Sequence, residues 1–188
     1  GTKNDVAEGN ANVGTYGSYQ DFGSIIITNN GNTTYSNYVR TLDLTTATGT
    51  VSYTDGNGVN HKREYIASYP DGVVAVRLSA STEGSINIKV ALEVGETLSA
   101  STNYSNGYAY FSGSSFTDGN GSTVSYNARF KVIPTGGTMS TTNSGITVSG
   151  ANEVLIVLAG GTDYDPTNTN YVSNTGSLST TVQSRVDA

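Results

Sequence analysis

The stretch REYIASYPDGVVAVRLSA, residues 63–80, has two apolar runs on either side of Tyr-Pro-Asp-Gly. Pro70 presets φ for the second position of a turn, and Gly72 can adopt the left-handed conformation that closes a hairpin. Beyond the turn, every second residue is apolar, which is the period of a strand with one buried face. These residues are Val74, Val76, Leu78 and Ala80. The stretch therefore predicts a β-hairpin whose returning strand supplies core residues.

The same period recurs along much of the chain. In YVRTLDL, residues 38–44, alternation places Tyr38, Arg40, Leu42 and Leu44 on one face, and SINIKVALEV, residues 85–94, alternates too. About eleven short strands are expected, with turn signals about every 8–12 residues, which is typical of an all-β sandwich or barrel. We therefore predict an all-β fold, a large antiparallel β-sandwich.

The length of 188 residues suits one large β domain, which we place at residues 1–174. Residues 175–188 are expected to form a C-terminal tail or linker. Leu178, Val182 and Val186 fall at helical spacing there, behind a Ser/Thr cap, so the tail is a candidate short helix. The chain begins without Met, so we expect a trimmed or mature fragment.

Composition and charge argue against several classes of protein. Charged residues make up only 13% of the chain and the net charge is −6, so neither nucleic acid nor an anionic membrane surface is an expected partner. The chain has no cysteine, which excludes disulfides and thiolate metal sites. No apolar run approaches the roughly 20 residues that span a bilayer. The polar composition favours an extracellular bacterial protein.

Candidate catalytic groups are few. His61 is the single histidine, and we interpret it as a solvent-facing strand residue rather than a catalytic base. Several Asp side chains fall in turn sequences, where Asp is expected for turn geometry alone. Glu64 and Glu93 are expected to pair across strands with Arg77, Lys89 or Lys62. We therefore assign no catalytic residue to this chain.

The segment TDYDPTNTNY, residues 162–171, is rich in oxygen-bearing side chains. Ca²⁺ takes six to eight such ligands, so Asp163 and Asp165 are candidate calcium ligands. A polar connector with a turn at Asp165-Pro166 is the simpler interpretation. No cofactor is required, and calcium remains one candidate.

Aromatic residues suggest a second kind of site. The chain has thirteen Tyr, four Phe and no Trp. Sugars stack their C–H faces on aromatic rings while amides take their hydroxyls. The candidate carbohydrate-binding residues are Tyr104, Tyr108, Asn103 and Asn106, with Tyr35 and Tyr38 as a second group. Tyr is also an ordinary strand residue, so a purely structural role stays open.

Three segments in order carry a family resemblance. They are Tyr19–Gly23 (YQDFG), Arg40–Ala47 (RTLDLTTA) and Arg63–Asp71 (REYIASYPD). Together they resemble the N-terminal β domain of glycoside hydrolase family 95, the α-L-fucosidases. That family has a Tyr-Gln-Pro-x-Gly-Asp-Leu segment, an Arg-x-Leu-Asp-Leu-x-x-Ala strand and an Arg-Glu-x-Phe-Ala-Ser-x-Pro-Asp hairpin. The likeness extends to GGTDYDP near Asp165.

The resemblance implies a β-sandwich of the galactose-mutarotase-like type. It also implies enzymes that remove terminal L-fucose with inversion, with their catalytic groups in a downstream α/α barrel. We expect none of that barrel in this chain, and hence a non-catalytic carbohydrate-binding module of an extracellular bacterial glycoside hydrolase. Its expected partners are a plant or host glycan and the catalytic domain of the same polypeptide. Alternatively, the domain only supports that barrel and binds no glycan.

Overall fold

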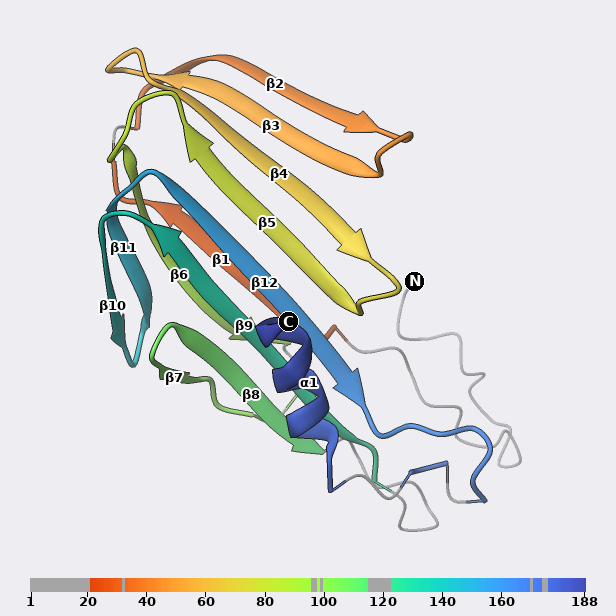
Figure 1. Cartoon of the computed structure of the whole chain (residues 1–188). Coiled ribbons are helices and arrows are strands. Elements are labelled where there is room, and N and C mark those ends of the chain that lie inside the picture. Colours follow the sequence, from red (N-terminus) through yellow and green to blue (C-terminus); the bar gives the residue numbers. More distant parts are fainter. Residues whose placement is uncertain are drawn as a thin grey trace, which may run out of the picture.

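The computed structural model describes residues 21–31, 33–95, 98, 100–114, 123–169, 171–173 and 176–188. Within them the chain forms two antiparallel sheets and one short helix, so the predicted all-β sandwich is confirmed (Figure 1). The strands are β1 (Gly23–Asn29), β2 (Tyr35–Asp43), β3 (Thr48–Asp55), β4 (Asn60–Ser68), β5 (Val73–Ala80), β6 (Ile86–Val94), β7 (Asn103–Ser105), β8 (Tyr108–Ser114), β9 (Ser125–Thr135), β10 (Thr138–Thr142), β11 (Gly145–Ala151) and β12 (Glu153–Thr162). Tyr19 and Gln20, which carry part of the family resemblance, lie outside the described residues.

The two sheets differ in width. The larger sheet has the strand order β2-β3-β4-β5-β12-β9-β8-β7, and the smaller has the order β1-β6-β11-β10. Their facing sides form one core, in which Phe111, Phe130, Ile146 and Ile156 are fully buried. Inward and outward side chains alternate along these strands; polar residues flank Phe130, whereas Ile156 lies in the continuous apolar run of β12.

The opening hairpin has the predicted geometry. β4 and β5 pair from His61↔Ala80 to Ser68↔Val73, and Gly72 closes the turn at a φ of 64°. Val76 and Leu78 are buried in the core, as predicted. The assignment of Val74 to the core is wrong, because this residue lies at the turn end of β5, outside the core cluster, and is 40% exposed.

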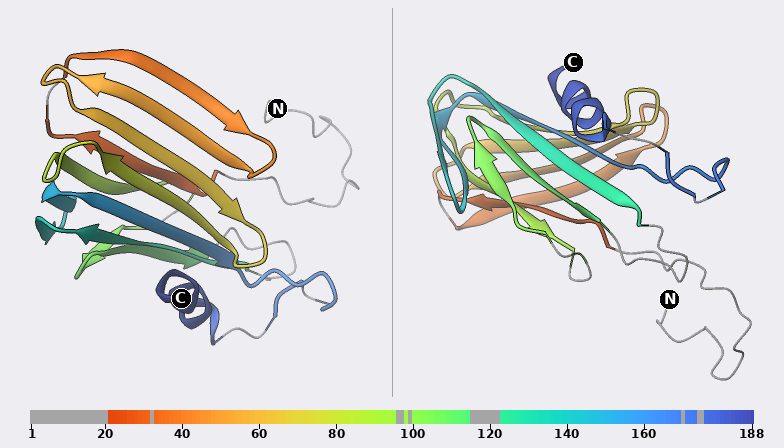
Figure 2. Two further views of the ribbon diagram at one scale, coloured as in Figure 1. Left: turned by 45° about the horizontal axis from the view of Figure 1, so that its top comes forward. Right: turned by 90° about the horizontal axis from the view of Figure 1, so that it is seen from below.

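The C-terminal segment forms helix α1 (Leu178–Asp187), as its spacing predicts. Val182 and Val186 are buried, and Leu178 packs against them. The helix contacts β9 and β12 on the face of the larger sheet opposite the core (Figure 2, right). The domain boundary at residue 174 stays a prediction. Among the residues that the structure describes, no helix has the length and apolar character needed to span a membrane.

The smaller sheet leaves part of the larger one uncovered. The core residues of the larger sheet come from β5, β8, β9 and β12, whereas no residue of β2, β3 or β4 is fully buried. Figure 1 shows β2, β3 and β4 fanning out beyond the smaller sheet, whose nearest strand is β1. The inward face of these three strands is therefore open to solvent, and it is the surface on which a site can form.

Candidate functional site

The open inward face of β2–β4 is built by strand pairing. Residues paired across antiparallel strands share a face, so the pairs Arg40↔Val51 and Val51↔Arg63 set three side chains in one row. Tyr53 and Tyr65 lie two positions along the strands and share that face. The next pair in the row, Arg63 with buried Leu78 on β5, shows that this face is the inward one. We call this surface the tyrosine face; its residues are Tyr35, Tyr38, Arg40, Val51, Tyr53, Arg63 and Tyr65.

A concave pocket of about 570 Å³ lies on the tyrosine face. Its walls are the four tyrosines with Val51 and Arg63, and Asn29 and Thr33 close it on the side of β1. Tyr35 is 67% exposed and Tyr38 is 54% exposed, so their rings are accessible from solvent. The structure thus brings together the second group of predicted sugar-binding residues, in a geometry that suits stacking against a flat ligand.

Tyr53 is fixed at the centre of this surface. Its ring stacks on the ring of His61 with centroids 5.0 Å apart, and the ring of Tyr35 meets it edge-on at 6.3 Å. Asn29 Nδ2 donates a hydrogen bond of 3.2 Å to the Tyr53 hydroxyl. A ring held on three sides loses little conformational freedom when a ligand binds, which favours affinity.

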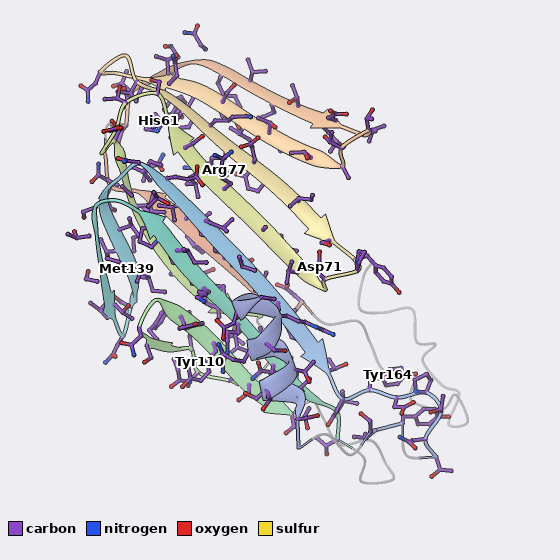
Figure 3. All side chains as sticks on the ribbon, in the orientation of Figure 1. His61, Asp71, Arg77, Tyr110, Met139 and Tyr164 are labelled. Atoms are coloured by element: carbon purple, nitrogen blue, oxygen red, sulfur yellow. The ribbon has the colours of Figure 1, made fainter. Side chains whose placement is uncertain are left out.

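His61 lies on the inward face, not toward solvent, and the sequence-based interpretation of this residue is wrong. The pairs Tyr53↔His61 and His61↔Ala80 turn its side chain inward, and only 15% of it is exposed. Its Nε2 lies 3.1 Å from Asp55 Oδ2. Figure 3 places His61 at one end of the larger sheet, where Asp55 begins the turn to β4.

Asp55 is a structural carboxylate. Its Oδ1 accepts the backbone N–H groups of Asn57 and Val59 at 2.9 and 3.0 Å. The hydrogen bond from Val59, followed by that from His61, lowers the pKa of Asp55 below its ordinary value. The carboxylate is therefore ionised at neutral pH and holds the turn and the imidazole in place.

Arg63 bridges the two sheets. Its Nη2 donates a hydrogen bond of 2.6 Å to Asn29 Oδ1 on β1. The side chain also lines both the tyrosine-face pocket and a smaller cavity of about 40 Å³ beside His61. A guanidinium has five N–H donors, so this one hydrogen bond leaves most of them for a ligand or water.

The first group of predicted sugar-binding residues is split between two surfaces. In the β7–β8 hairpin, Tyr104 pairs with the buried Ala109 and faces the core, and its hydroxyl accepts a hydrogen bond of 3.0 Å from the Leu92 backbone N–H. Tyr108 pairs with Ser105, one position along, and lies on the opposite face. The two rings therefore cannot stack on the same sugar.

Tyr108 lies under helix α1. Its hydroxyl donates a hydrogen bond of 2.6 Å to Asp187 Oδ1, and Lys131 Nζ lies 5.3 Å from the centroid of its ring. Lys131 Nζ also donates to Asp187 Oδ1 at 2.8 Å. These contacts, led by the hydrogen bond from Lys131, hold the pKa of Asp187 far below its usual range. We call Tyr108, Lys131 and Asp187 the helix clasp.

The two asparagines of the first group lie at the tip of the same hairpin. Asn106 occupies the turn with a φ of 49°, a conformation that Asn tolerates better than most residues. Asn103 Nδ2 donates a hydrogen bond of 3.1 Å to the Ser101 carbonyl. Both side chains are exposed. Sugar binding by this group stays a prediction, and the structure shows a structural role for its two rings.

The predicted calcium ligands face different surroundings. Asp163 is buried, and its Oδ1 accepts the Ser125 backbone N–H at 2.7 Å. Asp165 is exposed and accepts hydrogen bonds from Thr167 and Asn168, of which the side-chain bond from Thr167 contributes most to its lowered pKa. Within the described ranges, no group of three or more His, Asp and Glu side chains is placed to hold a metal ion. Calcium binding here stays a prediction.

The outward face of β4, β5 and β12 has an ion-pair network. Arg77 contacts Glu64 at 3.3 Å and Glu153 at 2.5 Å, and Lys62 contacts Glu64 at 2.6 Å. The cross-strand pairing predicted for Glu64 is thus confirmed. The hydrogen bond from Lys62 lowers the pKa of Glu64, and Glu153 raises the pKa of Arg77. Glu64 directly follows Arg63 in β4, so the network lies on the opposite face of the sheet from Arg63.

Sequence reasoning missed most of the pocket. Tyr53, Tyr65, Arg63 and Asn29 were not among the predicted site residues, although all four line the pocket. The alternation in TVSYT and HKREYIAS indicates that Tyr53 shares a face with Val51, and Tyr65 with Arg63. What the sequence could not supply was the width of the smaller sheet, which decides whether that face is core or open.

These observations define the class of protein, which is an all-β sandwich with an open, tyrosine-lined face. The chain belongs to the family described as glycosyl hydrolase family 65, N-terminal domain, whose model matches residues 2–167. The expectation of an N-terminal β-sandwich domain of a glycoside hydrolase is therefore confirmed.

Two further comparisons support the family and the fold. "Alpha-L-fucosidase 2" of Arabidopsis thaliana is 43% identical over 60 residues, which is 32% of this chain and 7% of that protein. A solved structure provisionally named as a kojibiose phosphorylase from the human microbiome superimposes on 93% of this chain and 27% of its own, with a TM-score of 0.56 and 8% identity. The chain thus spans well under two thirds of either relative.

Proposed function

We propose that this chain is a non-catalytic carbohydrate-binding module of an extracellular bacterial glycoside hydrolase, and that it binds glycan on the tyrosine face. The observation that carries the proposal is the pocket of about 570 Å³ lined by four tyrosines on strands that the smaller sheet leaves uncovered. Family membership and the partial likeness to a fucosidase support a parent enzyme that acts on sugars. The other proposed partner is the catalytic domain of the same polypeptide.

The pocket has the mixed character that sugar binding requires. Exposed rings on Tyr35 and Tyr38 offer stacking surfaces, while Asn29 and Arg63 offer an amide and a guanidinium at one edge. The site is open rather than enclosed, so a bound oligosaccharide keeps much of its surface in water. Stacking and a few hydrogen bonds, less the cost of ordering, give about micromolar to millimolar affinity.

Affinity electrophoresis through a panel of soluble polysaccharides tests the proposal. At least one polysaccharide is expected to retard the protein, and Tyr38→Ala is expected to remove that retardation, because the exposed Tyr38 ring is lost without disturbing the core. Tyr69→Ala is the matched control, because Tyr69 is 97% exposed but lies on the β4–β5 turn, away from the tyrosine face. Equal migration of wild type and Tyr38→Ala in every gel would contradict glycan binding at this face.

A second candidate function is structural support of a fucosidase-type catalytic domain. A groove of about 630 Å³ runs beside the β4–β5 turn, lined by Tyr69, Val74, Leu158 and Arg185 among others. The exposed apolar side chains of this groove are typical of a docking surface. If support is the function, Tyr69→Asp should abolish co-purification with the separately expressed catalytic domain, and Tyr38→Ala should not.

A further inference from the structure

Two arginines stand on the tyrosine face. Arg40 on β2 and Arg63 on β4 both pair with Val51 of the strand between them, so they lie on either side of it in one row. Two strand spacings separate them, about 10 Å. Tyr53 and Tyr65 lie one step from this row on opposite sides of it, because β3 and β4 are antiparallel. A ligand that spans the two rings therefore crosses the row between the two arginines.

Neither arginine forms an ion pair with a carboxylate among the residues that the structure describes. Lys62, Arg77 and Lys131, by contrast, form ion pairs with carboxylates. Asp55 lines the small cavity beside Arg63, but its carboxylate is already hydrogen-bonded to His61 and to two backbone N–H groups.

Strand register accounts for the excess positive charge on this face. Asp43 lies three residues from Arg40 in β2, and Glu64 lies one residue from Arg63 in β4, so alternation turns both carboxylates to the other side of the sheet. The whole chain has a net charge of −6, so the tyrosine face is a cationic surface on an acidic protein. The net charge of the whole protein therefore disfavours a general attraction of polyanions.

Stacking rings and amides are sufficient to bind a neutral sugar, without guanidinium groups that lack an ion-pair partner. Such a guanidinium group suits a carboxylate, because the planar fork of arginine matches the two carboxylate oxygens in paired hydrogen bonds. The contact between Arg63 Nη2 and Asn29 fixes the guanidinium at the edge of the pocket. This arrangement places a carboxylate-binding group beside a sugar-stacking surface.

We infer that the tyrosine face recognises an acidic oligosaccharide, with a uronate carboxylate bound to Arg63 and a second one facing Arg40. The inference rests on the proposed function, since it names the ligand class of the same face. The exposed rings of Tyr35 and Tyr38 stack on the sugar, and the two arginines select the charged residues of the oligosaccharide.

Isothermal titration calorimetry with trigalacturonate and with its methyl ester tests the inference, because the two probes share one backbone and differ in charge. The acid is expected to bind at least about tenfold more tightly than the ester, with an affinity that falls as salt rises. Arg63→Gln and, separately, Arg40→Gln are expected to remove most of that difference. Arg77→Gln, on the opposite face, is the control and should leave binding unchanged.

The outcomes separate the inference from the proposed function. Equal binding of acid and ester, lost in Tyr38→Ala, would overturn the inference and uphold the glycan-binding function. Binding of neither probe would also overturn the inference, and the polysaccharide panel would then decide the function alone. An equal loss of affinity for the acid in Arg77→Gln and Arg63→Gln would show non-specific attraction and would also overturn the inference. Circular dichroism of each variant establishes that it is folded.

Discussion

The helix clasp allows a prediction in which two contributions can be separated. Asp187 on α1 accepts hydrogen bonds from Lys131, Tyr108 and Gln183, while Val182 on the same helix is fully buried. Asp187→Asn keeps an oxygen that can accept the Tyr108 hydroxyl but removes the charge. Val182→Ala keeps the charge and removes buried methyl groups. The two variants therefore probe electrostatic and hydrophobic docking of one helix.

The hydrophobic contribution is the larger. Burying Val182 and Val186 stabilises the docked helix by about 1.5–3 kcal/mol each, as an upper estimate. The side chain of Asp187 is 36% exposed, so solvent screens its ion pair with Lys131, and the charge is worth only about 0.5–1 kcal/mol. Val182→Ala should thus destabilise docking by about 2 kcal/mol and Asp187→Asn by at most about half as much.

Amide hydrogen exchange of residues 178–187 is the appropriate assay. A helix of ten residues is marginal in water by itself, so undocking unfolds it and exposes its amides. Exchange is expected to accelerate about thirtyfold in Val182→Ala and about two- to fivefold in Asp187→Asn. Faster exchange in Asp187→Asn than in Val182→Ala would refute the ranking of the two contributions.

The same clasp predicts a pH dependence. The folded pKa of Asp187 lies below its unfolded value of about 3.9, so the stabilisation is complete above pH 4 and is lost as pH falls toward the folded pKa. The exchange difference between wild type and Asp187→Asn should therefore be constant from pH 5 to 7 and shrink below pH 4. A difference that persists unchanged in acid would show that the charge is not its cause.

Two further predictions concern the fold itself. Gly137 has a φ of 68°, and a Cβ there would lie 2.3 Å from the Ser149 carbonyl oxygen, so Gly137→Ala should lower the free energy of unfolding by more than about 2 kcal/mol in urea denaturation. Gly58→Ala, at a φ of 81° with open space around it, is the matched control and should lower it by about 1 kcal/mol. Phe111→Ala should lower the free energy of unfolding by about 3–5 kcal/mol, and the melting temperature with it, because this ring is fully buried. Leu44→Ala should stay within about 0.5 kcal/mol because Leu44 is 84% exposed, and equal melting temperatures for these two variants would contradict the core assignment.

Local pattern was sufficient to predict most of the fold. The alternation after Gly72 correctly placed Val76 and Leu78 in the core, because period two and a turn signal are local properties of a strand. The helical spacing of Val182 and Val186 likewise predicted the buried face of α1. Val74 has the same pattern and is nevertheless exposed, since burial depends on what covers the end of a strand.

The site was harder to predict because it depends on partners distant in sequence. Tyr35 and Tyr38 were identified from composition, and the structure joins them to Tyr53 through pairing of neighbouring strands. Tyr104 and Tyr108 carry the same compositional signal, but register sends them to opposite faces. Which tyrosines share an accessible surface is decided by register and by the width of the smaller sheet, and neither is visible in a local motif.

Under the proposed function, the charge of the two exposed surfaces favours a different partner for each. The core of a permanent protein interface is depleted of charge, since burying an unpaired cation is unfavourable. The tyrosine face has Arg40 and Arg63 among its rings, so permanent cover by a second domain would bury both cations without a carboxylate partner from the described residues. The groove at Tyr69 and Val74 lies at the turn between β4 and β5 and has one arginine in its lining, Arg185. A glycan at the first surface and a partner domain at the second are therefore compatible in one molecule, and Tyr38→Ala and Tyr69→Asp should each abolish one interaction and spare the other.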